Sequence, residues 1–136
     1  MSRSDILAKF ESHAIKTTPQ RLEIAGILLE KPQHLSAEQI ISRLRASGSS
    51  VSKATVYNSL KLFGERGLVK ELAVDSKRRF YDSSTHAHHH FYNIDTGELS
   101  DIEDEQLYLC HLPELPQGTE RHSVEILVKI RNRQLL

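Results

Sequence analysis

The hydrophobic pattern of this chain changes its period near Gly67. Before Gly67, apolar residues recur at helical spacing after residues that can cap helices, such as Thr18, Ser36 and Ser52. After Gly67, short runs of apolar and β-branched residues are separated by turn residues, which is typical of strands. Helices followed by strands predict an α+β chain.

The first part of the chain has the element order of a winged helix-turn-helix domain. Four helices are expected: Ser4, Thr18 and Ser36 cap the first three, and Ser52 or its neighbour caps the fourth. A basic hairpin is expected to follow over residues 68–81. In such a domain the last helix enters the major groove of DNA, and the hairpin lies along the phosphate backbone. We therefore predict a DNA-binding domain over residues 1–82.

The remaining residues form a shorter second part. We expect a hinge at residues 83–87 and a small α/β dimerisation and metal-binding domain at residues 88–136. Its expected elements are strands at 88–94, 98–102 and 124–131, with a short helix at 104–110. A module of about 50 residues buries little core by itself and leaves strand edges unpaired. Pairing with a second copy answers both problems, so we predict a homodimer.

Charge is divided unequally between the two parts. Residues 1–80 contain 14 lysines and arginines against 8 acidic residues, whereas residues 81–136 contain 4 against 10. Six of the eight histidines lie in the second stretch, and four of them fall between positions 86 and 90. A basic half and an acidic, histidine-rich half suggest a polyanion-binding task and a cation-binding task. Ordinary variation of surface charge is the alternative.

The expected fourth helix carries polar side chains suited to reading DNA. With Val56, Leu60 and Phe63 facing the core, the polar positions beside them face outward. Such side chains bond phosphates and base edges. The candidate DNA-binding residues are Lys16, Arg21, Ser52, Lys53, Thr55, Tyr57 and Asn58. A charged, solvated helix face is the alternative explanation.

Five other side chains form a candidate metal site. His88 and His90 are two apart on an expected strand and so share a face, and Asp101 lies on the partner strand. Asp82 precedes the hinge and His34 precedes the third helix, so folding at the hinge can bring both to the same ion. A mixed nitrogen and oxygen site suits Fe²⁺ or Mn²⁺ better than tetrahedral structural zinc. A solvated histidine run is the alternative.

Several classes are excluded by what the sequence lacks. No apolar run approaches the roughly 18 residues of a membrane span, and no secretory signal is visible. Cys110 is the single cysteine, which favours a reducing, cytoplasmic location. No catalytic motif is present, so we do not expect an enzyme. A metal-trafficking module without DNA affinity remains a remote alternative.

Four ordered blocks resemble the ferric uptake regulator (Fur) superfamily. They are residues 16–21 (KTTPQR), 32–38 (PQHLSAE), 52–58 (SKATVYN) and 67–72 (GLVKEL), and the similarity continues through the histidine cluster to Asp101. The resemblance implies a dimeric, metal-dependent bacterial transcription factor that binds a double-stranded DNA operator, here expected to be a repressor. It also implies that Tyr57 contacts thymine and that Lys16 reaches the minor groove.

The resemblance extends to the metal site, with one regulatory ion per subunit. His34, Asp82, His88, His90 and Asp101 each fall where the family's regulatory ligands lie. Aspartates at both acidic positions look most like the peroxide-sensing branch, PerR, where bound Fe²⁺ reacts with peroxide and the histidines matching His34 or His88 are oxidised. The run His88–His90 also resembles the haem-responsive Irr branch, so an iron or haem signal is the alternative. A second metal site, if present, could use His89 and His122.

One departure from the family concerns zinc. Most members hold a structural zinc with Cys-x-x-Cys pairs, and this sequence has neither pair. We expect no structural zinc, and we expect the turn at residues 95–97 to replace its local role by geometry.

Overall fold

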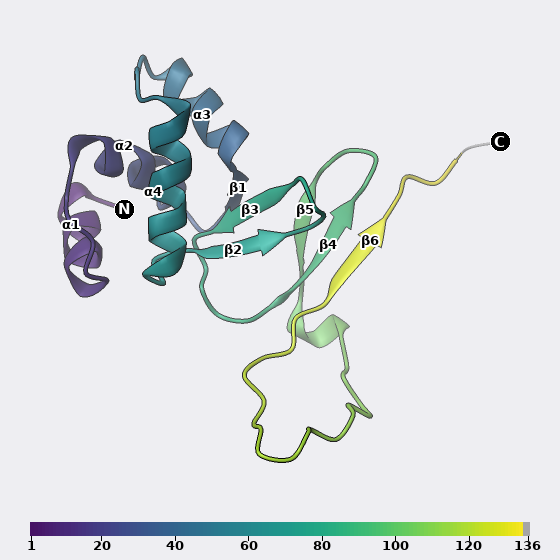
Figure 1. Cartoon of the computed structure of the whole chain (residues 1–136). Helices are drawn as coiled ribbons and strands as arrows, with labels where there is room; N and C mark the ends of the chain where they lie inside the picture. The colour runs from purple at the N-terminus through teal and green to yellow at the C-terminus, as the bar shows by residue number, and fades with distance from the viewer. Residues whose placement is uncertain (135–136) are drawn as a thin grey trace. The chain divides into compact units, whose positions relative to one another are not determined.

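The computed structural model describes residues 1–134, which divide into two compact units. The first unit comprises Met1–Thr85, and the second begins at His86. Figure 1 shows helices and a small sheet in the first unit and a second sheet in the other. The α+β class predicted from the sequence is thereby confirmed. None of the helices in the described part of the chain has the length and apolar character needed to cross a membrane.

Side-chain caps define the helices of the first unit. The helices are α1 (Arg3–Ser12), α2 (Pro19–Leu28), α3 (Ala37–Ala46) and α4 (Lys53–Glu65). As predicted, Thr18, Ser36 and Ser52 accept hydrogen bonds from the third residue of the helix that each begins. Helix α1 begins earlier than expected, because Ser2 and Asp5 form a reciprocal capping box there.

The core of the first unit lies among these helices. Phe10 of α1 and Phe63 of α4 are fully buried, and their ring centroids are 5.6 Å apart. Gly67 follows α4 with a φ of +76°, and the N–H of Leu68 bonds back to the Phe63 carbonyl. This left-handed residue ends the helix as predicted, since glycine adopts such a φ without a Cβ clash. Helix α4 is therefore fixed on its buried side and leaves its other face exposed.

A three-stranded antiparallel sheet completes the first unit. Its strands are β1 (His34–Ser36), β2 (Lys70–Ala73) and β3 (Arg79–Asp82), in the order β1-β3-β2. The hairpin of β2 and β3 was predicted, whereas strand β1 was not. The strand forms because Ser83 donates its N–H to the Gln33 carbonyl and accepts the Gln33 N–H on its hydroxyl. This register places His34 directly opposite Asp82.

The second unit is built on a mixed sheet. Its strands are β4 (His89–Asn93), β5 (Leu99–Ile102) and β6 (Leu127–Ile130), in the order β5-β4-β6. Strand β4 pairs antiparallel with β5 and parallel with β6. The three expected strands are present, although each is shorter than its predicted range. Because β4 is central, both neighbouring strands position its side chains.

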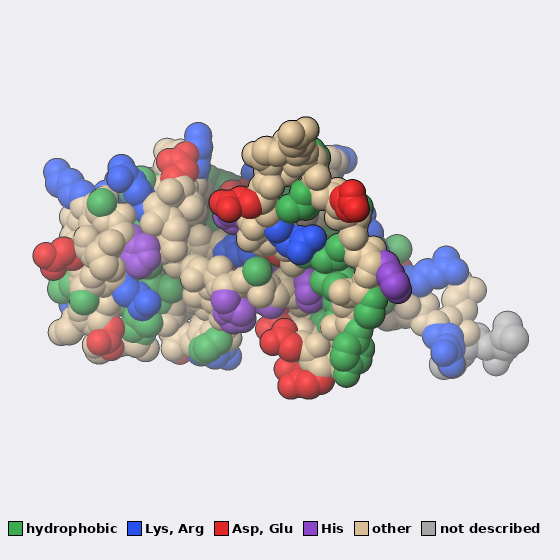
Figure 2. Space-filling model, turned by 90° about the horizontal axis from the view of Figure 1, so that it is seen from below, with side chains coloured by type: hydrophobic (Ala, Val, Ile, Leu, Met, Phe, Trp, Pro, Cys, Tyr) green, Lys and Arg blue, Asp and Glu red, His purple; other side chains and the backbone are tan. Residues whose placement is uncertain are grey.

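The segment between β5 and β6 contains less helix than expected. Only a 3-10 turn, η1 (Asp104–Gln106), forms where a helix over residues 104–110 was predicted. Its surroundings explain the difference, because η1 buries no residue and so short a helix is marginal without packing. Beyond it the chain exposes apolar side chains, including Tyr108, Leu112 and Leu115. Figure 2 shows green hydrophobic surface beside red acidic groups in this part of the molecule.

A hydrogen-bonded turn joins β4 to β5. The Asn93 side-chain oxygen accepts the N–H groups of Asp95 and Thr96 at 2.9 and 3.1 Å. Gly97 has a φ of +75°, as this tight turn requires. Asp95 also accepts the N–H of Asn132 at 2.9 Å, which attaches the turn to the chain beyond β6.

Candidate metal centre and the exposed face of helix α4

Three of the predicted ligands meet in the second unit. His90 of β4 lies opposite Asp101 of β5 in the strand register, and His88 directly precedes β4. Oδ1 of Asp101 is 3.3 Å from Nε2 of His90 and 3.4 Å from Nε2 of His88. Both imidazoles are buried, at 2% exposure for His90 and 7% for His88, whereas the carboxylate is 54% exposed. The carboxylate thus forms the open side of a buried histidine pair.

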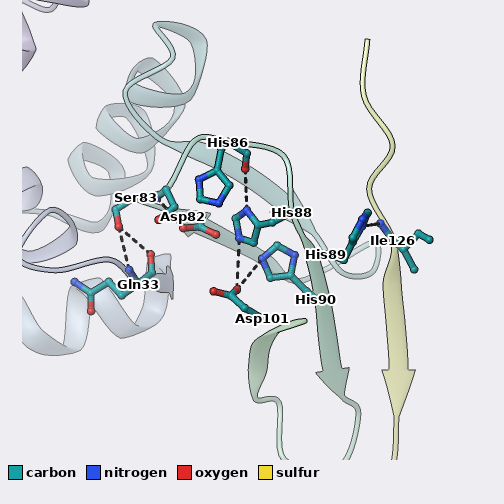
Figure 3. Close-up of polar contacts among 10 residues, drawn as sticks. Gln33, Asp82, Ser83, His86, His88, His89, His90, Asp101 and Ile126 are labelled. Carbon is teal, nitrogen blue, oxygen red and sulfur yellow. Dashed lines mark hydrogen bonds and ion pairs between the residues drawn. The ribbon is translucent and has the colours of Figure 1, made fainter. Parts of the chain in front are cut away.

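The backbone of His86 fixes the tautomer of His88. Nδ1 of His88 lies 2.8 Å from the His86 carbonyl oxygen, which can only accept a hydrogen bond (Figure 3). Nδ1 therefore carries a proton, and in the neutral form of the ring the lone pair is on Nε2, on the side of Asp101. Proteins commonly orient a metal-binding imidazole in this way, with a backbone carbonyl that accepts the N–H of the nitrogen facing away from the ion.

The spacing of these three groups fits a divalent ion. Two metal–ligand bonds of about 2.1 Å that meet at the ion at an angle of about 90–109° place their two donor atoms about 3.0–3.4 Å apart. The measured separations of 3.3 and 3.4 Å fall in that range, and the ligand atoms of the three side chains all lie within 4.8 Å of one another. Two imidazoles and a carboxylate suit Fe²⁺, Mn²⁺ or Zn²⁺, so the donor set does not by itself select one metal.

The other two predicted ligands belong to the first unit. His34 and Asp82 face each other across the β1–β3 pair, at the end of the sheet. Asp82 Oδ1 accepts the N–H of Ser84 at 2.8 Å. The His34 ring packs edge-on against Phe80, with centroids 6.4 Å apart. Strand pairing therefore brings these two residues together, which the sequence alone did not predict.

His89 has a different role from its neighbours. Its Nδ1 accepts the N–H of Ile126 at 2.9 Å, beside the bond from the His90 N–H to the Ile126 carbonyl (Figure 3). The ring thus extends the β4–β6 ladder, as alternation along a strand allows. His122, its suggested partner in a second metal site, is exposed and lies 3.4 Å from the hydroxyl of Ser123.

The predicted DNA-binding residues divide into two groups in the first unit. On α4, Lys53, Tyr57 and Asn58 are exposed, whereas Ser52 and Thr55 bond each other at 2.9 Å in the helix cap. At the start of α2, the Arg21 guanidinium donates to the Lys16 carbonyl at 2.7 Å. One contact was not predicted: the Tyr57 hydroxyl donates to Glu38 of α3 at 2.6 Å.

Comparison with known proteins identifies the class to which this fold and site belong. Residues 12–126 match the Ferric uptake regulator family, and the chain belongs to that family. It is 32% identical over 103 residues to the peroxide-responsive repressor PerR of Staphylococcus saprophyticus, covering 76% of this chain and 70% of the relative.

Two solved structures show the same fold. The ferric uptake regulator of Pseudomonas aeruginosa with manganese is 25% identical, with a TM-score of 0.71 over 94% of this chain and 98% of its own. PerR from Streptococcus pyogenes is 28% identical, with a TM-score of 0.51 over 73% and 68%.

Family membership decides among the functional classes. The chain is a metal-dependent transcriptional regulator and not an enzyme, as the sequence predicted. Proteins of this family bind DNA operators as dimers. The histidine and aspartate cluster of the second unit is consistent with a regulatory metal site.

Proposed function

We propose that this chain is a repressor that senses peroxide through Fe²⁺ bound at one regulatory site per subunit, with Mn²⁺ as an alternative ion. The cluster of His88, His90 and Asp101 carries this proposal, because its nitrogen and oxygen donors already converge at metal-binding distances. The relatives named peroxide-responsive repressors support the choice of signal. We place this activity in the cytoplasm, where Cys110 would stay reduced.

His34 and Asp82 are proposed to complete the ligand set. They are already paired across β1 and β3, and Asp82 lies only a few residues before the second unit begins. An ion that binds side chains of both units favours one relative placement of the DNA-reading and dimer-forming parts. A coupling of about 1–3 kcal/mol would change operator affinity roughly 5- to 150-fold.

The proposed operator contacts are those of α4 and the start of α2. Tyr57, Asn58 and Lys53 are exposed on one helix that the core holds rigidly, and Lys16 and Arg21 add positive charge. The proposed dimer forms through the second unit, where Tyr108, Leu112 and Leu115 are exposed. A sedimentation experiment should give twice the chain mass, and a monomer at micromolar concentration would contradict this part.

Mass spectrometry after peroxide exposure tests the proposed signal. When bound, Fe²⁺ would promote cleavage of the peroxide O–O bond beside the ligand rings, so that one peroxide oxygen would add to a ring carbon and the other would leave as water. An oxidised imidazole is a weaker metal ligand, so the metal should dissociate. The operator should then be released. We expect one added oxygen on the peptide of His34 or His88 with Fe²⁺, and none with Mn²⁺ as the matched control. Release of DNA without any histidine oxidation would reject peroxide sensing by this route.

An iron- or haem-responsive regulator is the alternative. The rings of His86, His88 and His90 lie in succession, with centroid distances of 4.7 and 4.3 Å, and His86 is exposed. Exposed histidines next to buried ones offer axial ligands to a haem. Titration with haem should produce a Soret band that His86→Ala weakens if this alternative is right.

A further inference from the structure

The contact between Tyr57 and Glu38 joins two helices of the first unit. Tyr57 lies on α4 and Glu38 in the first turn of α3, 19 positions earlier in the chain. The phenolic hydroxyl donates to Glu38 Oε1 at 2.6 Å, which is the usual length when a hydroxyl donates to a carboxylate. Tyr57 is nevertheless 44% exposed, so its ring is accessible while its hydroxyl is engaged.

The electrostatic surroundings make Glu38 a strong acceptor. The bond from Tyr57, followed by the backbone N–H of Glu38 itself, lowers the pKa of this carboxyl below its ordinary value. Its position in the first turn of α3 adds the favourable field of the helix N-terminus. The same bond raises the pKa of the Tyr57 phenol. At neutral pH the contact is therefore a charge-assisted hydrogen bond from a neutral phenol to a carboxylate.

A groove of about 660 Å³ lies beside this contact. Glu38, Tyr57 and Asn58 line it on the helical side, and Glu71 and Arg79 line it on the sheet side. Arg79 forms an ion pair with Glu71 across β2 and β3 at 2.5 Å. A phenol has a single proton to donate. The Tyr57 hydroxyl donates its one proton in the hydrogen bond to Glu38. The exposed Tyr57 ring is therefore the part of the side chain that remains for contact with a ligand.

We propose that Glu38 is a specificity-determining residue, which fixes the Tyr57 ring so that its apolar surface, rather than its hydroxyl, contacts the base edge in DNA. The inference rests on the proposed function, because it requires α4 to be the DNA-reading helix. A fixed ring presents a defined apolar surface, such as a thymine methyl group would contact. Because this bond lowers the pKa of Glu38, the carboxylate stays ionised and repels the phosphates of any duplex to the same extent.

Four variants separate the possible roles of this pair. Operator-like duplexes are first selected by wild-type protein with Mn²⁺ from a random library. The ratio of affinities for the selected duplex and a scrambled duplex is then measured by fluorescence anisotropy.

Glu38→Ala and Tyr57→Phe should each lower this ratio by about tenfold. Glu38→Gln, whose side-chain oxygen can still accept the bond, should keep the ratio within about twofold while tightening binding to both duplexes. The double variant Glu38→Ala/Tyr57→Phe should lower the ratio no further than either single variant, because each single substitution already removes the same hydrogen bond.

Glu65→Gln provides the matched control. Glu65, the last residue of α4, is another carboxylate that lines the same groove; its substitution removes one charge and should leave the ratio unchanged. An unchanged ratio in Glu38→Ala, or additive losses in the double variant, would overturn the inference but leave the proposed function standing. A ratio that falls in Tyr57→Phe but not in Glu38→Ala would also overturn the inference, because the Tyr57 hydroxyl would then contact DNA directly. If wild-type protein selects no sequence with Mn²⁺, the proposed function fails and the inference fails with it.

Discussion

His90 and Asp101 occupy directly opposed positions of β4 and β5, with Nε2 and Oδ1 3.3 Å apart. Strand pairing, and not a flexible loop, thus sets the distance between a buried imidazole and an exposed carboxylate. A site built on paired strands is held close to one geometry before any ion arrives, which reduces the entropy lost on binding.

Removing the exposed ligand should abolish the metal response without unfolding the chain. In Asp101→Ala we expect Mn²⁺ affinity to fall by at least about tenfold and metal-dependent operator binding to disappear. Because Asp101 is largely exposed, the thermal midpoint of the metal-free protein should stay within a few degrees of wild type. Asp104→Ala changes an exposed carboxylate outside the cluster and serves as the control. Unchanged Mn²⁺ affinity in Asp101→Ala would reject the ligand assignment.

The second unit should fold without zinc. Asn93 holds the β4–β5 turn through the N–H groups of Asp95 and Thr96, and Asp95 bonds Asn132. Asn93→Ala should therefore destabilise the protein by about 1–3 kcal/mol, as measured by urea unfolding. A strong chelator should remove at most the stabilisation that the regulatory ion provides and should leave the second unit folded. Stoichiometric zinc in the purified protein, with unfolding on its removal, would contradict this prediction.

The contact between Tyr57 and Glu38 predicts a pH dependence of stability. Glu38 has a folded-state pKa below its ordinary 4.5, so its contribution is present above that value and is lost as the pH falls through the folded-state pKa. Tyr57 has a pKa raised above 10.0, so its contribution is lost only in strong alkali. The stability difference between wild type and Tyr57→Phe should be constant from about pH 5 to pH 9 and shrink below about pH 4. Urea midpoints across this range measure it, and a difference that varies near pH 7 would show that another group controls the contact.

Tyr57→Ala should separate DNA reading from metal binding. We expect it to weaken binding to the selected duplex by about tenfold or more and to leave Mn²⁺ affinity unchanged, because Tyr57 is not one of the proposed ligands. Isothermal titration with Mn²⁺ and anisotropy with DNA measure the two properties on the same preparation. A parallel loss of both would point to a folding defect instead.

Local patterns were sufficient to predict part of this structure. The caps at Thr18, Ser36 and Ser52 depend on a few adjacent residues, and the shared face of His88 and His90 follows from strand alternation. Strand β1 has three residues and exists because Ser83 bonds Gln33, 50 positions away. The bond of Tyr57 to Glu38 likewise spans 19 positions. Such contacts depend on tertiary packing, and the periodicity of the sequence does not predict them.

The proposed function requires one ion to couple the DNA-reading unit to the metal-binding unit. Linkage requires that operator DNA tighten Mn²⁺ binding by the same factor by which Mn²⁺ tightens operator binding. Titrating Mn²⁺ into the protein with and without the selected duplex measures this factor directly. We predict a roughly 5- to 150-fold higher Mn²⁺ affinity in the presence of the duplex. Equal Mn²⁺ affinities with and without DNA would contradict the account.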